Sequence, residues 1–93
     1  MLHRPKLFLR SSGISIRPVD GASVLVREEK HLYFALNRVG ARIWSLLEQP
    51  QSIEDIVKVL AQEFAIGEEQ CRFETERFIR QLIDRDLVET PPV

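Results

Sequence analysis

The side chains best suited to nucleophilic or acid–base catalysis in this sequence are two histidines, His3 and His31, and one cysteine, Cys71. A catalytic nucleophile needs a base within hydrogen-bond reach and usually a third group that orients the base. The sequence shows no glycine-framed serine, no paired-carboxylate motif and no glycine loop for phosphate. Structural zinc sites gather four Cys or His ligands, which is more than this chain possesses. We therefore expect no catalytic residue, no bound metal and no cofactor, and we interpret His31 as a surface residue.

The composition is that of one small domain. With 93 residues, 44% hydrophobic and 29% charged, the chain can bury a single core beneath an ordinary charged surface. One cysteine excludes a disulfide within the chain, which agrees with a reducing compartment. The first residues lack the apolar stretch of a secretory signal, and no segment approaches the roughly 20 apolar residues of a membrane span. We expect a cytoplasmic protein that does not contact a membrane.

Three short apolar runs predict an antiparallel sheet in the first half of the chain. They cover residues 14–18, 23–27 and 31–36. Asp20-Gly21 is typical of a two-residue hairpin turn between the first two runs, and the polar residues 28–30 separate the second run from the third. Residues 1–12 are expected to be a basic arm, in which residues 7–10 can form a short extra strand.

Helical periodicity follows in the second half, with capping signals at the predicted starts. Asn37 can cap a helix over residues 38–48, because its side-chain oxygen can accept an unpaired backbone N–H. Ser52, with Asp55 three residues later, approximates a capping box for a second helix. A third helix is expected over about 68–85. The chain is therefore predicted to be an α+β winged helix-turn-helix, in which a three-stranded antiparallel sheet is followed by three helices.

Apolar positions at strand and helix spacing identify the expected core. Its members are Leu36, Ile43, Leu46, Leu47, Ile56, Leu60, Phe78 and Leu82. On the third predicted helix this places Phe78 and Leu82 inside. The residues beside them then form either a groove wall or ordinary surface: Arg72, Thr75, Glu76 and Ile79.

The third strand run combines two adjacent aromatic residues with a place near the edge of the sheet. A strand at a sheet edge exposes N–H and C=O groups that a guest strand can complete. Tyr33 and Phe34 should point to opposite faces, so one can fill the core while the other helps to line a groove. Aromatic residues often anchor a partner, although both side chains can also simply pack within the fold.

The charges argue against a nucleic-acid partner. A DNA-binding helix-turn-helix places its second helix among phosphates, and phosphate contacts supply much of the affinity, but residues 68–86 sum to −2. Only the basic arm favours DNA. Residues 1–47 carry +5 and residues 48–93 carry −6. This dipolar pattern either orients a charged peptide or reflects solvated faces without special meaning.

One combination of soft hydrophobic motifs runs through residues 14–88. A strand ends in Leu36-Asn37, the segment GARIW follows at 40–44, and Leu87-Val88 closes the pattern. In this combination the chain resembles the PqqD-like family, small winged-helix domains that bind the leader segment of a ribosomally made precursor peptide. In that family the leader adds to the third strand and lies against the third helix. The resemblance implies peptide contacts at these residues: His31, Leu32, Tyr33, Phe34, Ala35, Cys71, Arg72, Thr75, Glu76 and Ile79.

The family includes a pyrroloquinoline-quinone chaperone and stand-alone recognition proteins of lasso-peptide pathways. The layout of residues 15–47 looks more like the lasso type. That resemblance implies three partners, namely a precursor leader, a leader peptidase and a macrolactam-forming cyclase of the same pathway. The quinone-cofactor chaperone is the nearest alternative, and a winged-helix DNA-binding protein is the alternative from another class. The recognition domain is expected over residues 13–89, between the arm and a tail at 90–93.

Three positions depart from the family pattern. Gln49-Pro50 stands where the family usually has glycine after the first helix, and Asp86 stands where it has glycine before the final Leu-Val. Aspartate tolerates left-handed backbone angles better than most residues, so the second turn can persist. Glu76 replaces a residue that is often apolar, which can change the leader residues that the groove accepts.

Overall fold

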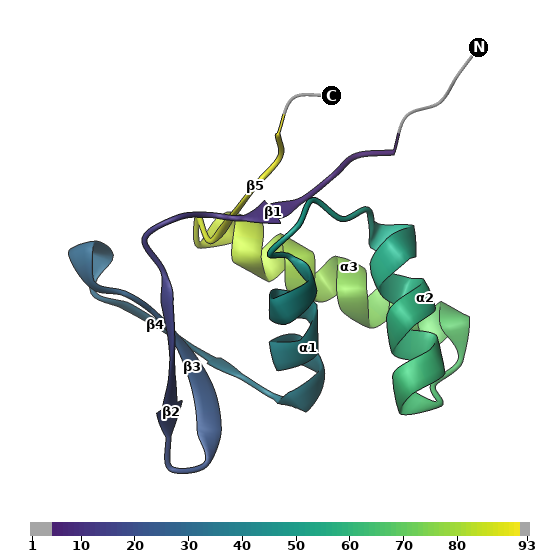
Figure 1. Cartoon of the computed structure of the whole chain (residues 1–93), viewed down its shortest axis with the longest axis horizontal. Helices are drawn as coiled ribbons and strands as arrows, with labels where there is room; N and C mark the ends of the chain where they lie inside the picture. The colour runs from purple at the N-terminus through teal and green to yellow at the C-terminus, as the bar shows by residue number, and fades with distance from the viewer. Residues whose placement is uncertain (1–4, 92–93) are drawn as a thin grey trace.

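In the computed structural model, which describes residues 5–91, a three-stranded antiparallel sheet precedes three helices (Figure 1). The elements are β1 (Leu9–Arg10), β2 (Ser15–Val19), β3 (Ala22–Arg27), a 3-10 helix (Glu28–Lys30), β4 (Leu32–Leu36), α1 (Arg38–Leu46), α2 (Ile53–Phe64), α3 (Glu68–Asp84) and β5 (Val88–Glu89). The main sheet has the order β2-β3-β4, and β1 pairs with β5 in a separate two-stranded sheet. The predicted fold class is confirmed.

The β2–β3 hairpin turns through two residues that both have left-handed backbone angles. Asp20 has a φ of 50° and Gly21 a φ of 83°, and the flanking residues Val19 and Ala22 pair with each other. Positive φ at both central residues is the type I′ geometry, whose twist matches that of the strands it joins. The predicted turn at Asp20-Gly21 is confirmed, and it holds β3 at the centre of the sheet.

The connection from β3 to β4 is a short 3-10 helix that shortens the predicted third strand by one residue. His31 follows this helix with a φ of 51° and donates its backbone N–H to the carbonyl oxygen of Glu28 at 3.0 Å. Because that bond closes the turn, β4 begins at Leu32. The prediction that the strand begins at His31 is wrong, since a polar residue before an apolar run can belong to the turn as well as to the strand.

Capping bonds set the starts of the first two helices. The Asn37 side-chain oxygen accepts the N–H of Gly40 at 2.7 Å. Ser52 and Asp55 form the reciprocal capping box, with bonds of 3.1 and 3.3 Å. Both predicted caps are confirmed. The C-terminal end of α2 is less expected, because the left-handed residue that ends it is Ala65, with a φ of 52°.

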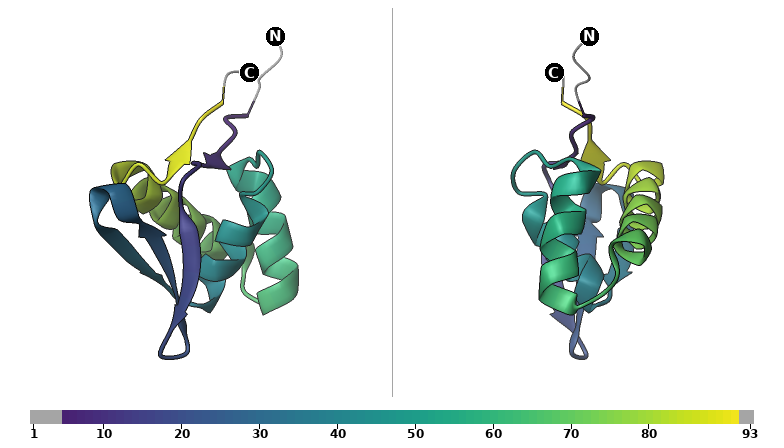
Figure 2. Two further views of the ribbon diagram at one scale, coloured as in Figure 1. Left: turned by 60° about the vertical axis from the view of Figure 1, so that its left-hand side comes forward. Right: turned by 90° about the vertical axis from the view of Figure 1, so that its right-hand side faces the viewer.

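The helices pack on one side of the β2-β3-β4 sheet, as the two views of Figure 2 show. The core lies between these layers and includes Leu25, Ile43, Leu47, Ile56, Leu60, Leu82 and Leu87, each at most 1% exposed. Of the eight predicted core residues, six are buried. The other two, Leu46 and Phe78, are half-buried and pack against the edge of the core.

Part of the predicted N-terminal arm belongs to the fold. β1 pairs with β5, so that Leu9 lies opposite Glu89, and these two strands lie side by side at one end of the molecule (Figure 1). Phe8 is 6% exposed in the core and exchanges backbone bonds of 2.8 and 2.9 Å with Gln51. The folded unit therefore includes residues from Phe8 onward, which is earlier than the boundary expected at residue 13. Residues 1–4 of the arm and 92–93 of the tail lie outside the described residues.

Candidate functional site

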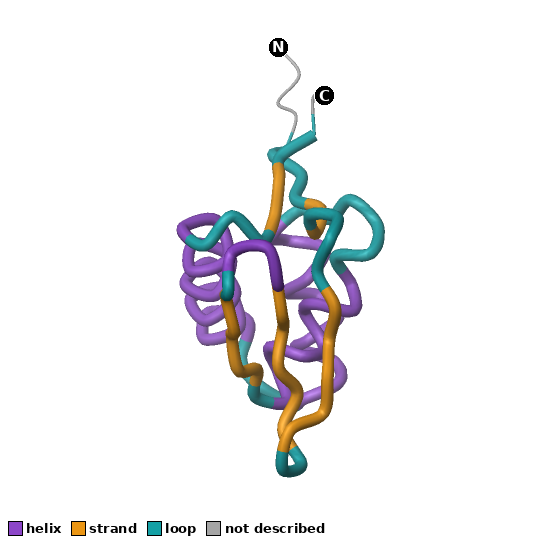
Figure 3. Tube along the Cα trace, turned by 90° about the vertical axis from the view of Figure 1, so that its left-hand side faces the viewer, coloured by secondary structure: helices purple, strands orange, loops and turns teal. Residues whose placement is uncertain are grey.

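The strand β4 lies at an edge of the main sheet. It pairs with β3 on one side, and in the described part of the chain no strand pairs with its other side (Figure 3). An unpaired edge presents backbone N–H and C=O groups in a row. The opposite edge strand, β2, contains Pro18, which has no N–H to donate. β4 is therefore the edge better suited to accept a further strand.

Side chains alternate between the two faces of β4. Phe34 is half-buried on the helix side, where its ring centroid lies 6.1 Å from that of Phe78 on α3. The guanidinium of Arg85 lies 4.9 Å from the same Phe34 centroid. Tyr33 is 66% exposed and must point to the other face. The prediction of opposite faces is confirmed, and Phe34 is the aromatic residue that faces the helices.

A cleft of about 400 Å³ opens beside this aromatic pair, between α1 and α3. Side chains on its α3 wall are Gln70, Glu74, Arg77, Phe78 and Gln81. Val39 and Gly40 of α1 border it on the other side, and the buried Leu60 of α2 lies between. Gly40 allows the Phe78 ring to approach, because a Cβ there would lie 3.2 and 3.3 Å from two atoms of that ring. The cleft thus combines apolar walls with charged side chains.

The buried seam of α3 differs from the predicted one. Its members are at most 2% exposed and comprise Cys71, Thr75, Ile79 and Leu82. Phe78, which was predicted for the core, borders the cleft, and Ile79, which was predicted for the groove wall, is buried. The flank of α3 that faces the cleft therefore carries Glu74, Arg77 and Gln81, and it lies on the other side of the seam from the predicted groove wall.

Only one of the five α3 residues predicted to contact a peptide borders the cleft, and that residue is Cys71. Thr75 and Ile79 belong to the buried seam and do not border the cleft. Arg72 points toward α2, and Glu76 is exposed outside the cleft. The residue types do not show which flank of α3 faces the cleft, because both flanks of the seam mix arginine, glutamate and apolar residues. The packing of α3 on α2 decides which flank faces the cleft.

Two ion pairs, each with two hydrogen bonds, hold α2 against its neighbours. Arg72 of α3 donates to both carboxylate oxygens of Glu54 at 2.8 Å. Arg42 of α1 donates to both oxygens of Glu63 at 2.8 and 2.9 Å. These hydrogen bonds lower the pKa of Glu54 and the pKa of Glu63. Both arginines are therefore engaged within the fold.

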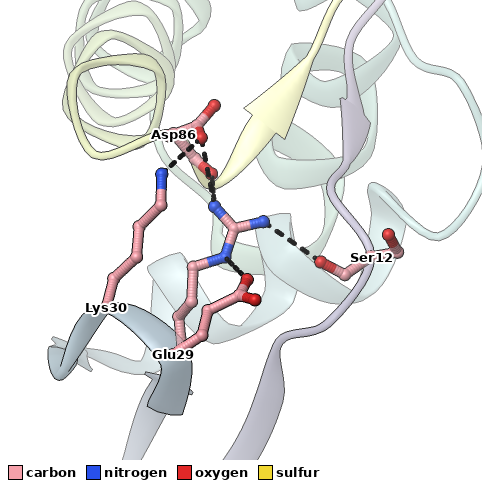
Figure 4. A network of polar contacts seen from close by, with 5 residues as sticks. Ser12, Glu29, Lys30 and Asp86 are labelled. Carbon is pink, nitrogen blue, oxygen red and sulfur yellow. Dashed lines mark hydrogen bonds and ion pairs between the residues drawn. The ribbon is translucent and has the colours of Figure 1, made fainter.

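A buried arginine links the end of β3 to the turn after α3. Arg27, 8% exposed, donates to the carbonyl oxygens of Asp86 and, at 3.2 Å, of Ser12 (Figure 4). Lys30 donates to the Asp86 carboxylate at 2.8 Å, and this hydrogen bond is the main cause that lowers the pKa of Asp86. Asp86 has a φ of 59°, so aspartate does support the left-handed turn. The network ties the turn before β4 to the turn after α3 and so fixes their separation.

The described residues offer binding contacts more clearly than reactive groups. Burial, followed by the charge of Glu68, raises the pKa of the Cys71 thiol, so the thiol is protonated at neutral pH. His31 is exposed at its turn, and His3 lies outside the described residues. Within residues 5–91, no three His, Cys, Asp or Glu side chains gather as a metal site requires. No helix in that range is long and apolar enough to cross a membrane.

These features define a small α+β domain of the winged helix-turn-helix type, with an open edge strand whose Phe34 contacts Phe78, a residue of the third helix that lines the cleft. The family model for coenzyme PQQ synthesis protein D (PqqD) matches residues 22–88. The chain therefore belongs to the PqqD family. No curated protein sequence matches it significantly.

Two solved structures share the fold. The structure of TbiB1 in complex with the TbiA(beta) leader peptide is 29% identical, has a TM-score of 0.76, and covers 91% of this chain and 99% of its own. A lasso peptide synthetase B1 complexed with the leader peptide is 21% identical at a TM-score of 0.76, and covers 88% of this chain and 96% of its own. The second likeness shows the fold alone.

Proposed function

We propose that the chain binds the leader segment of a ribosomally made precursor peptide as an additional strand on β4, and catalyses no reaction. The open edge of β4 carries this proposal, because no described strand pairs with it and its Phe34 contacts Phe78, which lines the cleft on α3. Strand addition supplies backbone hydrogen bonds, while pockets for alternate side chains supply sequence choice. The likeness to TbiB1, whose structure contains a leader peptide, supports the proposal.

The contacts of the bound leader follow from the geometry of β4. Its backbone would pair with Leu32–Leu36, and its alternate side chains would reach Phe34 and Phe78. Among the residues predicted as contacts, His31 has its N–H engaged in the turn, and Tyr33 contributes its backbone while its ring points away. These assignments replace the predicted wall of Arg72, Thr75, Glu76 and Ile79.

We further propose a place in a lasso-peptide pathway. The leader would be the direct partner, and a leader peptidase and a macrolactam-forming cyclase would act on the precursor that the chain delivers. The resemblance of the layout of residues 15–47 to the lasso type supports this assignment, and the fold shared with a lasso peptide synthetase B1 agrees with it. The name of the matching family model favours a second candidate, a peptide chaperone of quinone-cofactor synthesis. Neighbouring genes discriminate the two: a short precursor gene with a cyclase and a peptidase, or a radical enzyme for quinone assembly.

Fluorescence anisotropy tests the binding itself. Purified protein is titrated into the labelled leader of the precursor encoded beside its own gene, into a scrambled peptide of the same composition, and into duplex DNA at the same salt concentration. We expect saturable binding of the leader alone. Micromolar or tighter binding of DNA without binding of the leader would contradict the proposal and favour a DNA-binding winged helix.

A further inference from the structure

Two arginines near the cleft have no carboxylate partner among the described residues. Arg77 borders the cleft, and Arg85 lies over the Phe34 ring. Arg42 and Arg72, in contrast, each bind a glutamate that joins two helices. Since Arg77 and Arg85 are also exposed, a charged partner can reach them without breaking an internal ion pair.

The rise between these two arginines matches the distance between side chains four residues apart on one face of a strand. Arg77 and Arg85 are eight residues apart, which corresponds to a rise of about 12 Å along the helix. Four residues of a strand span about 13 Å, and every second side chain points the same way. Side chains four residues apart on a guest strand can therefore reach both arginines at once.

Contacts near the two ends of β4 show how α3 runs relative to this strand. Lys30, just before β4, binds Asp86, just after α3. Gly40, a few residues after β4, faces the Phe78 ring. The two elements thus run in opposite directions, and a strand paired with β4 follows the helix. The rings of Phe34 and Phe78 lie near the two arginines and offer an apolar contact, and Gln81 lies midway between the arginines on the helix.

We propose that the guest strand carries two acidic side chains four residues apart, which pair with Arg77 and Arg85, and an apolar side chain midway on the same face. The proposal rests on the proposed strand addition to β4. Because both cations are exposed, each pair contributes about 1.5–5-fold in affinity and weakens with salt. Glu74, on the preceding turn of the same wall, disfavours a further acid beyond Arg77. Backbone hydrogen bonds do not distinguish one peptide sequence from another, so these charges would determine which peptides bind preferentially.

Selection from a displayed library of random peptides, each about 12 residues long, tests the proposal independently of the natural leader. The full chain is immobilised, and enriched sequences are compared for the natural protein, Arg77→Gln and Arg80→Gln. Arg80 is exposed on the same helix and does not border the cleft. Its variant is therefore a matched control for the loss of one positive charge.

We expect the natural protein and Arg80→Gln to enrich peptides with Asp or Glu at two positions four apart and an apolar residue midway. Arg77→Gln should lose the preference at one acidic position, and should bind a synthetic consensus peptide about 1.5–5-fold more weakly by calorimetry at low salt. Enriched peptides without the acidic spacing, or with both acidic positions retained on Arg77→Gln, would overturn the proposal while strand addition stands. No enrichment of any peptide would contradict the proposed function itself.

Discussion

Ile79 and Ile83 lie one turn apart on α3. Replacing each of them with alanine in a separate variant tests which of the two side chains is buried. Ile79 is 2% exposed within the core, whereas Ile83 is 45% exposed. The change from isoleucine to alanine removes three carbon atoms, worth about 2.4 kcal/mol of transfer free energy when fully buried. A cavity adds to that cost at an enclosed site. We expect losses of about 3–4 kcal/mol for Ile79→Ala and about 1 kcal/mol for Ile83→Ala.

Urea denaturation followed by tryptophan fluorescence measures both losses. With a slope of about 1 kcal/mol per molar urea, as in small domains, the Ile79→Ala midpoint should fall by about 3 M. That is a large share of the roughly 5–15 kcal/mol that stabilises a typical domain. Equal losses of stability in the two variants, or a loss below about 1 kcal/mol for Ile79→Ala, would refute the assignment of Ile79 to the buried seam. The assignment of Glu74, Arg77 and Gln81 to the cleft would then fail with it.

Three further predictions concern the turn at Asp86, acid unfolding and the lone thiol. Asp86→Ala should be about 1 kcal/mol less stable than Asp86→Gly in urea, because both lose the carboxylate but only alanine is strained at a φ of 59°; equal midpoints would contradict this. Because the pKa values of Asp86, Glu54 and Glu63 are lowered in the folded protein, the unfolded chain binds protons at these groups at a higher pH than the folded chain does. Their stabilisation is therefore complete above about pH 5 and declines as the pH falls through 4, and a melting temperature unchanged down to pH 3 would oppose it. The buried Cys71 should react slowly with a thiol reagent at pH 8 until urea unfolds the chain, so rapid labelling of the folded protein would contradict its burial.

Features set by neighbouring residues could be predicted from the sequence. Asn37 caps α1 and Ser52 caps α2 with their own side-chain oxygens, and Asp20-Gly21 adopts the backbone angles that its turn demands. Each of these depends on bonds within a few residues, so residue type and spacing are sufficient. The left-handed angle of Asp86 is expected for a different reason, because the PqqD-like pattern has glycine at this place and aspartate tolerates such angles.

Features set by packing between distant segments could not be predicted in the same way. The pairing of Leu9 with Glu89 joins the two ends of the chain, and hydrophobic periodicity carries no information about such a partner. The burial of Ile79 in place of Phe78 depends on how α3 rotates against α2. A shift of the seam by a fraction of a turn exchanges the two flanks, which is why most of the predicted α3 contacts lie away from the cleft.

Hydrogen exchange of the β4 amides, with and without leader, tests the central claim most directly. Strand addition engages the outward N–H groups of β4 in new hydrogen bonds, and it covers the cleft side of α3 around Phe78. We predict that amides within Leu32–Leu36 exchange at least about tenfold more slowly when the leader of the neighbouring precursor gene is bound. Protection confined to α1 and α2, with the exchange of Leu32–Leu36 unchanged at saturating leader, would contradict strand addition to β4.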